Sequence, residues 1–450
     1  MTDSSQPLFM ASNNMFVKKT NGFYLILNPD APNIMVSNEL GKQILELCDG
    51  QLSLSDITEK ITSRNGIDQT SLKQYIHSLM KAGFILKNPP PPVQGRLVEE
   101  PQLGVLILHI TEACNLRCKH CYFECGNASE NEMGIGEYLR IVNEFVELGG
   151  VSLLLTGGEP LLRRSILFRT IKYARDYAQI ERIVVDTNGT LLTERDAKLF
   201  AKYDVDVGVS LDGATPSTHD FIRGKGTYNK TLKAIKRLVK AGAKVTTGTT
   251  LMKPNFKEFE SVIRLGKELG VDSANFTLLK VRGRAKDNEK EIVCSVGDIL
   301  STVKKILKVS KEIGMKTSVE KMELDLKKLE RGTDLCGAGT TALSISANGD
   351  VYPCDALYFD NLRAGNIRTQ KLNEIWKNSP VLKTLRDLSV TRIEKCKDCE
   401  IKFICGGGCL AERYDLYKSF EKCTPMCPVY NAIHWFLVSK IAKDMWEELK

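Results

Sequence analysis

Two short apolar runs followed by three amphipathic helical patterns open the chain. The runs, 23–28 and 34–37, flank an Asn-Pro-Asp-Ala-Pro turn, which is typical of a β-hairpin. Helical spacing follows over 39–47, 55–64 and 69–81, and each pattern stops at a turn that contains glycine. A last run, 84–87, is expected to return to the hairpin as a strand. The pattern predicts a small winged-helix-like unit over residues 1–87, with the first 20 residues as a loose arm.

The hydrophobic pattern changes at residue 105, where apolar strand-like runs begin to alternate with amphipathic helical patterns. The runs cover 105–110, 151–155, 183–186, 205–211, 244–251 and 274–279, and helical patterns between them include 135–148, 193–201, 228–241 and 256–269. Six β/α units in series predict a parallel sheet covered by helices, either an open sheet or a partial barrel, over 105–290. In such folds the chemistry gathers at the C-terminal ends of the strands.

The remaining segments complete the domain plan. The proline run after Asn88 disfavours both helix and sheet, so 88–104 is predicted to be a stiff linker. Residues 291–335 form a lysine-rich helical bridge, 336–428 a cysteine-rich domain, and 429–450 a C-terminal amphipathic helix. A chain of 450 residues is long enough for several buried cores.

Composition adds one strong signal, the cysteines. Charged residues at 26% and the hydrophobic class at 42% fit a globular protein. No apolar run could span a bilayer and no export signal is visible, so we expect a cytoplasmic protein without membrane contact. Fourteen cysteines in a reducing compartment indicate metal ligation. Four fall between 114 and 125 and eight between 336 and 427, whereas Cys48 and Cys294 stand alone.

The net charge of +8 is spread along the chain, which is typical of a solvated surface. Nucleic-acid binding is therefore not expected. A mildly basic surface would equally suit a polyanionic small molecule or an acidic peptide leader.

The first cysteine cluster follows the first strand of the β/α series. Cys114, Cys118 and Cys121 lie on one loop at spacings that can hold three corners of a four-iron cubane and leave its fourth iron open. A zinc site would need four closed ligands in separated pairs, and the nearby Cys125 keeps that alternative open.

With Gly157-Gly158-Glu159-Pro160 after the second strand, this Cys-x3-Cys-x2-Cys loop resembles the radical S-adenosylmethionine (SAM) superfamily over 105–279. The resemblance implies that SAM chelates the open iron and yields a 5'-deoxyadenosyl radical, which abstracts hydrogen from the substrate. It implies SAM-binding roles for Gly157, Gly158, Glu159, Pro160, His120, Asn188, Ser210 and Arg223, and a catalytic role for Asp212 near the reacting centre. The strand-end residues have a structural alternative, because Asn-Gly and Asp-Gly are common turns.

The second cysteine block comprises Cys336, Cys354, Cys396, Cys399, Cys405, Cys409, Cys423 and Cys427. A zinc ribbon uses two Cys-x2-Cys pairs, and this block has one. Two four-iron clusters need up to eight thiolates, which is the number of cysteines in the block. The block resembles the SPASM extension of peptide- and protein-modifying radical SAM enzymes. That resemblance implies an inner cluster on Cys336, Cys354 and Cys409, and an outer cluster on Cys396, Cys399 and Cys405 plus Cys423 or Cys427. Some relatives supply a further inner thiolate that is missing here, so either one inner iron is open or a distant residue such as Cys427 or Cys294 fills the position.

The N-terminal unit resembles small precursor-recognition domains related to the peptide chaperone of pyrroloquinoline quinone synthesis. This implies that it binds the leader of a precursor peptide. A DNA-binding winged helix is the alternative, although the third helix carries few basic residues. Together the resemblances imply an α/β fold: a partial (β/α)6 TIM-like barrel with an N-terminal winged-helix-like domain and a C-terminal cysteine-rich iron–sulfur domain.

We therefore expect a radical SAM maturase that uses SAM and three [4Fe-4S] clusters to install a thioether or carbon–carbon crosslink in a ribosomally synthesised peptide. A flavodoxin or ferredoxin would be its external electron donor. The alternatives are a radical SAM enzyme that acts on a tetrapyrrole- or quinone-type cofactor precursor or on an enzyme active-site residue, and a non-enzymatic iron–sulfur or zinc scaffold. The oligomeric state and the roles of Cys48, Cys125 and Cys294 do not follow from the sequence.

Overall fold

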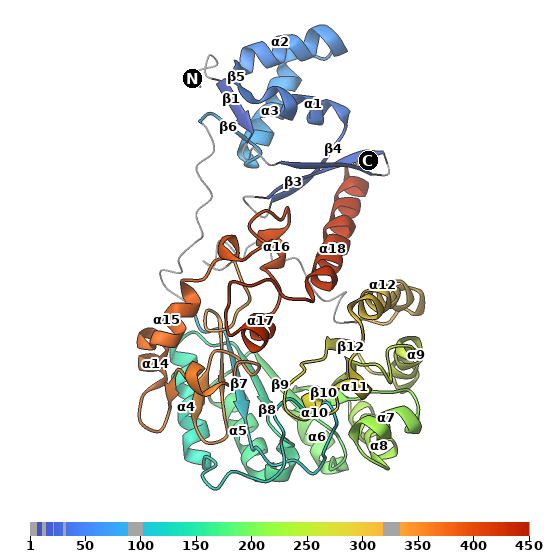
Figure 1. The fold of residues 1–450 in the computed structure, drawn as a ribbon, viewed down its shortest axis with the longest axis vertical. Coiled ribbons are helices and arrows are strands. Elements are labelled where there is room, and N and C mark those ends of the chain that lie inside the picture. The colour runs from blue at the N-terminus through green and yellow to red at the C-terminus, as the bar shows by residue number, and fades with distance from the viewer. Residues whose placement is uncertain are drawn as a thin grey trace.

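The computed structural model describes residues 7–10, 15–20, 22–29, 33–88, 102–317 and 334–449. Most of the predicted linker and residues 318–333 of the predicted helical bridge lie outside the described residues. A small N-terminal unit stands at one end of a large α/β body, and a long C-terminal helix runs between them (Figure 1).

The N-terminal unit consists of two small antiparallel sheets and three helices. Its strands are β1 (Pro7–Met10), β2 (Phe16–Thr20), β3 (Phe23–Asn28), β4 (Asn33–Ser37), β5 (Asp49–Ser53) and β6 (Ile85–Leu86), and its helices are α1 (Glu39–Leu47), α2 (Leu54–Asn65) and α3 (Gln69–Lys81). The hairpin and the three helices lie where the sequence predicts them. Local signals set their ends: Ser53 and Asp56 form a capping box at α2, and Gly66 ends that helix at a φ of 63°.

Two expectations for this unit are wrong. The predicted loose arm forms β1 and β2, and strand β6 pairs with β1 instead of returning to the hairpin. The apolar side chain of Leu8 explains the first error, because it is 1% exposed and packs into the core of the unit. Strand β1, which carries Leu8, is the central strand of this sheet, whose order is β5-β1-β6.

The α/β body is built on a sheet of order β12-β11-β10-β9-β8-β7-β13-β14-β15. The β/α series comprises β7 (Val105–His109), α4 (Ile135–Glu147), β8 (Ser152–Thr156), α5 (Arg164–Asp176), β9 (Arg182–Thr187), α6 (Glu194–Lys202), β10 (Asp206–Ser210), α7 (Pro216–Arg223), α8 (Thr227–Lys240), β11 (Lys244–Leu251), α9 (Phe259–Leu269) and β12 (Ser273–Leu278). Its six strands are parallel and lie in sequence order. This confirms the partial (β/α)6 barrel.

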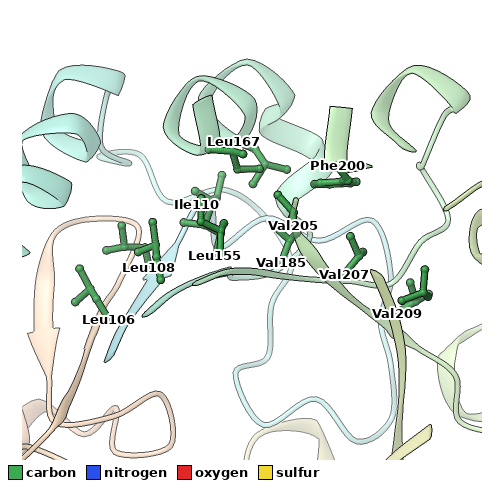
Figure 2. Packing of buried hydrophobic residues seen from close by; sticks show 14 of the residues in the cluster. Leu106, Leu108, Ile110, Leu155, Leu167, Val185, Phe200, Val205, Val207 and Val209 are labelled. Carbon is green, nitrogen blue, oxygen red and sulfur yellow. The ribbon is translucent and has the colours of Figure 1, made fainter. Parts of the chain in front are cut away.

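Alternate strand residues form the core between the sheet and its helices. Leu106, Leu155 and Val207 lie on the helix-facing side, where they pack with Leu167 of α5 and Phe200 of α6 (Figure 2). Because side chains alternate along a strand, the intervening positions face the opposite, concave side of the sheet. The strands therefore hold their C-terminal ends rigidly around a common centre.

The C-terminal region extends the same sheet. Its elements are α10 (Arg284–Asp287), α11 (Glu289–Ile292), α12 (Val296–Ile313), β13 (Ala342–Ile345), β14 (Asp350–Tyr352), β15 (Gly365–Asn366), α14 (Leu372–Asn378), α15 (Pro380–Arg386), α16 (Lys402–Cys405), α17 (Leu410–Tyr417) and α18 (Cys427–Glu448), with short 3-10 turns at Asp360–Leu362 and Val390–Arg392. A further 3-10 turn, Pro160–Arg163, lies between β8 and α5 of the barrel. Strand β13 pairs in parallel with β7, and β14 and β15 continue antiparallel. The cysteine-rich region and the barrel thus share one sheet.

The N-terminal unit docks on the C-terminal helix. Phe23, Leu25 and Leu27 of β3 are buried against Val438 and Ala442 of α18. The remaining face of β3 packs toward the helices of its own unit. Within the described part of the chain, no helix has the length and apolarity needed to cross a membrane.

Candidate active site

The first cysteine loop opens onto a cavity of about 600 Å³ at the C-terminal ends of the strands. Cys114, Cys118 and Cys121 all line this cavity, as does Cys125, which forms a hydrogen bond with Cys121. Three backbone and side-chain donors approach the thiols: Leu116 N lies 3.5 Å and Asn188 Nδ2 4.0 Å from Cys114 Sγ, and Arg223 Nη1 lies 4.0 Å from Cys118 Sγ. Donors directed at sulfur stabilise metal-bound thiolates, so this loop fits an iron–sulfur cluster.

Gly157 and Gly158 bring the next strand end into direct contact with the cysteine loop. Gly158 N donates to the Thr111 carbonyl at 2.8 Å, and Glu159 N donates to the Ala113 carbonyl at 2.8 Å. A Cβ on Gly158 would lie 2.0 Å from the Ala113 oxygen, and one on Gly157, whose φ is 132°, would lie 2.3 Å from the Thr111 oxygen. Only glycine allows this approach, because the colliding atoms belong to backbone.

We expect Gly158→Ala to separate the two loops and to weaken SAM binding by at least about tenfold, since the clash with backbone cannot be relieved by a rotamer change. Equilibrium binding of SAM to the reconstituted protein measures this. Gly136→Ala is the matched control, because a Cβ at that exposed helical glycine meets nothing within 4 Å. Equal affinities of the two variants would contradict the expectation.

Glu159 is buried and joins three segments. Its carboxylate accepts hydrogen bonds from Thr187 Oγ1 at 2.7 Å, Asn188 N at 2.8 Å and Leu161 N at 3.0 Å. Burial raises the pKa of Glu159 even though these three donors act in the opposite direction. We infer from these contacts that Glu159 orients the loop next to the SAM-binding residues. Pro160 begins the short 3-10 turn that follows.

A buried ion pair supports the far wall of the cavity. Arg223 Nε donates to Asp212 Oδ2 at 2.6 Å, and Thr250 N donates to Asp212 Oδ1 at 2.8 Å. Burial opposes ionisation of Asp212, but the charge of Arg223, the nearby His120 and the hydrogen bond from Thr250 N together hold the pKa of Asp212 below its usual range. His120 Nε2 lies 3.6 Å from the same carboxylate, and burial lowers the pKa of His120 to about 4.

The structure revises the expected role of Asp212. Arg223, His120, Asn188 and Ser210 line the cavity, whereas Asp212 is fully buried behind Arg223 and is not among the lining residues. A group without access to the cavity cannot touch a substrate there. We propose that Asp212 is a positioning residue that fixes Arg223.

The second cysteine block separates into two sets. Electrostatic interactions link Cys336 with Cys354 and with Cys409. The outer set is Cys396, Cys399, Cys405, Cys423 and Cys427, with Cys423 in hydrogen-bond contact with both Cys396 and Cys427. Cys427 therefore lies with the outer set, and Cys294 lines a different cavity beside Met426. In the described ranges, no three His, Cys, Asp or Glu side chains come close enough to hold a single metal ion.

The surroundings of Arg413 indicate whether iron–sulfur clusters fit these two sets of cysteines. It is fully buried on α17, and the thiols that act on it electrostatically belong to both sets: Cys336, Cys409, Cys396 and Cys423. Its Nη1 donates to the Phe420 carbonyl at 2.7 Å, while Nε and Nη2 have no hydrogen-bond partner among the described residues. A buried cation with free donors is costly unless anionic groups surround it. Thiolate-bound iron–sulfur clusters on either side would supply those groups.

Comparison with known proteins agrees with this site. The model of the radical SAM superfamily matches residues 108–266, and that of an iron–sulfur cluster-binding domain, SPASM, matches residues 336–400. The AdoMet-dependent heme synthase of Methanosarcina barkeri is 33% identical over 337 residues, which cover 71% of this chain and 94% of that protein. The chain belongs to the radical SAM superfamily. As a radical SAM enzyme, it binds SAM and iron–sulfur clusters and generates a 5'-deoxyadenosyl radical.

Other relatives of this radical SAM enzyme are named maturases. The mycofactocin maturase MftC of Mycobacterium ulcerans is 27% identical over 71% of this chain and 87% of that protein. The crystal structure of Streptococcus suis SuiB bound to SAM has the same fold, with a TM-score of 0.61 and 18% identity over 93% of this chain and 99% of SuiB. SuiB has also been solved bound to its precursor peptide SuiA.

The sequence reading missed several residues of this radical SAM site. Arg284 donates from Nε to the Cys118 carbonyl and from Nη1 to the Cys125 carbonyl, both at 3.1 Å, and so holds the cysteine loop. Asp355 lines the cavity and accepts a hydrogen bond from Tyr122 Oη at 2.6 Å. Arg284 had no sequence signal, whereas Tyr122 and Asp355 directly follow predicted cysteine ligands.

Proposed function

We propose that this enzyme is a maturase that abstracts hydrogen from a ribosomally synthesised peptide and forms a thioether or carbon–carbon crosslink. One observation carries the proposal. The cavity that contains the SAM-binding cysteine loop is also lined by Cys409 of the inner set and by Tyr430 and Ile433 of α18, the helix on which the N-terminal unit docks. A single helix thus connects the reaction centre to the candidate peptide-recognition unit.

The comparisons support a peptide substrate. The curated maturase relatives and the heme synthase each match close to 71% of this chain. The fold of SuiB, by contrast, covers 93% of it, and a precursor peptide is the molecule that SuiB binds. We infer that the N-terminal unit recognises the leader of a precursor peptide, as its sequence resemblance implies.

We further propose three [4Fe-4S] clusters. Cys114, Cys118 and Cys121 would hold the SAM-binding cluster; Cys336, Cys354 and Cys409 the inner cluster; and Cys396, Cys399 and Cys405, with Cys423 or Cys427, the outer one. Gly157, Gly158, Asn188, Ser210, His120 and Arg223 would contact SAM, with Glu159 and Pro160 fixing the loop. Reducing equivalents would come from a flavodoxin or ferredoxin.

Carboxylates of this chain are placed to take up the proton that crosslink formation releases. Crosslink formation removes two hydrogen atoms from the peptide: one leaves in 5'-deoxyadenosine, and the other leaves as a proton, while its electron would pass to an oxidised auxiliary cluster held by the inner cysteines. Asp186 and Asp355 both line the cavity. Asp186 is exposed to the cavity, where partial desolvation, with the charge of Asp355, raises its pKa to about 6. Asp186 is placed to accept the proton, and Tyr122 Oη orients the neighbouring Asp355.

A tetrapyrrole substrate is the second candidate, because the heme synthase relative is the more similar in sequence. The alignment with the heme synthase leaves more than a quarter of this chain unmatched. The two candidates therefore differ in whether the N-terminal unit is needed for turnover.

Incubation of the reconstituted enzyme with SAM, reductant and a candidate precursor peptide tests the proposal. We expect 5'-deoxyadenosine together with a peptide lighter by two hydrogen atoms. A peptide in which Ser replaces Cys distinguishes a thioether from a carbon–carbon crosslink, since only a thioether requires sulfur. If the inner set leaves one iron without a cysteine ligand, the Cys peptide alone should alter the spectrum of the auxiliary clusters. Turnover of a tetrapyrrole, with every peptide unchanged, would refute the proposal.

A further inference from the structure

A second cavity, of about 700 Å³, lies between the N-terminal sheet and helices α12 and α18. Six lysines line it: Lys18 of β2, Lys304, Lys308 and Lys311 of α12, and Lys440 and Lys443 of α18. Among the described lining residues, Asp444 has the single carboxylate. Apolar side chains complete the wall, among them Phe436, which is 38% exposed. We call this cavity the lysine groove.

Most lysines of the groove have no carboxylate partner among the described residues. Lys304, Lys308 and Lys311 lie four and three residues apart, so they project from one face of α12. All six are exposed, and within the described residues only Lys308 has a carboxylate at ion-pair distance, Glu312 at 3.8 Å. Like charges held together in this way destabilise the free protein and favour an anionic occupant.

The sheet side of the groove suits an extended chain. Lys18 faces Leu25 and Thr20 faces Phe23 across strands β2 and β3, and all four side chains line the groove. Strand β2 is an edge strand, since the described part of its sheet has the order β2-β3-β4. An edge strand offers backbone donors and acceptors to an added strand, with pockets for alternate side chains.

Helices α12 and α18, both labelled in Figure 1, contribute residues to the lysine groove and to the active-site cavity. Helix α12 contributes Val303 and Ile306 to the active-site cavity and Lys304 and Leu307 to the groove. Helix α18 contributes Ile433 to the cavity and Phe436, less than one turn further on, to the groove. At a rise of about 1.5 Å per residue, these positions are only about 5 Å apart along the helix axis. The groove and the active-site cavity therefore lie at nearly the same level along both helices.

We propose that the lysine groove binds an acidic, extended segment of the substrate peptide and directs the adjoining residues into the active-site cavity. The proposal rests on the peptide-maturase function above and adds the chemical character of the segment: carboxylates for the lysines, with apolar side chains between them. Nucleic acid fits less well, because every cation among the described lining residues is a lysine and bidentate recognition of phosphate and bases favours arginine.

Fluorescence anisotropy with the full-length reconstituted enzyme tests this. The probe is a labelled peptide of four Glu-Glu-Leu repeats, and its neutral counterpart has four Gln-Gln-Leu repeats. We expect K304E/K308E/K311E to bind the acidic peptide at least about tenfold more weakly than the wild type, with K440E/K443E agreeing. The matched control, K233E/K236E/K240E, removes the same charge from exposed positions of α8 on the barrel and should bind within about twofold of the wild type.

Each other outcome overturns the proposal. Equal weakening by the α12 and α8 variants would indicate only a general charge effect, and equal affinity for the neutral peptide would exclude carboxylate recognition. Tighter binding of a 20-nucleotide oligothymidylate, lost in the α12 variant, would assign the groove to nucleic acid. None of these results touches the maturase function itself, because that is measured separately as the loss of hydrogen from a peptide and as 5'-deoxyadenosine formation.

Discussion

Replacing Cys114, Cys118 and Cys121 together with Ala is expected to remove one four-iron cluster and all SAM cleavage, and to leave two clusters bound. The three thiols lie on one loop after β7, while the inner and outer sets lie between Cys336 and Cys427, beyond the β/α series. Because no auxiliary cysteine belongs to that loop, the remaining sets should still assemble. Iron and sulfide per chain, the electron paramagnetic resonance spectrum after reduction, and 5'-deoxyadenosine yield measure the result.

Cys125→Ala is the informative control for this variant. Cys125 lies in hydrogen-bond contact with Cys121 but belongs to no predicted ligand set. We expect Cys125→Ala to keep its iron content and to cleave SAM. Loss of a cluster in this single variant, or SAM cleavage by the triple variant, would show that the ligands are assigned wrongly and would reopen a four-thiolate site.

Replacing Arg223 with Met is expected to lower the free energy of unfolding by about 3–5 kcal/mol, because it leaves the carboxylate of Asp212 buried without its partner. Arg223 is 9% and Asp212 0% exposed, and their side chains lie 2.6 Å apart. SAM cleavage should also fall by at least about tenfold, since the same guanidinium lines the cavity and approaches Cys118 Sγ. Denaturant unfolding and 5'-deoxyadenosine formation give the two readouts.

The double variant R223M/D212N separates stability from function. It removes both charges, so most of the lost stability should return, while SAM cleavage should remain low if Arg223 contacts SAM or the cluster. Full recovery of SAM cleavage in the double variant would show that the ion pair has only a structural role.

The pH dependence gives an independent check on the ion pair. In the wild type the pKa of Asp212 is lowered, so its contribution to stability is lost as the pH falls through that value. In Arg223→Met burial raises the pKa instead, and the carboxyl takes up a proton more readily. The stability difference between variant and wild type should therefore shrink from neutral to mildly acidic pH. A constant difference would show that Asp212 is not the group responsible.

The sequence predicts the architecture of the barrel closely because its signals are local. Strand β11 and helix α1 begin and end at the predicted residues, since hydrophobic periodicity and flanking turns are read within a single segment. The first cysteine loop is predictable for a related reason. Its three thiols and the glycines at 157 and 158 lie at the ends of successive strands, and parallel strands bring such ends to one edge.

The sequence failed where a segment's partner lies far away in the chain. The arm before residue 20 lacks a clear pattern of its own, and it becomes strand only through pairing with β5, β6 and β3. Asp212 is predicted to be a strand-end carboxylate near the reacting centre, and only the tertiary structure shows that it is buried and paired with Arg223. The choice of fourth outer ligand stays open even in the structure, because Cys423 and Cys427 lie together.

By itself, then, the sequence determined the β/α series, the two blocks of cysteines and the enzyme superfamily, because spacing along the chain encodes each of them. Tertiary structure alone decided that Arg413 interacts electrostatically with thiols of both sets, that β13 joins the barrel sheet, and that six lysines from three separate elements line one groove. These features depend on packing between segments that are distant in sequence. Burial and electrostatic energies are set by such neighbours, and a linear pattern carries no record of them.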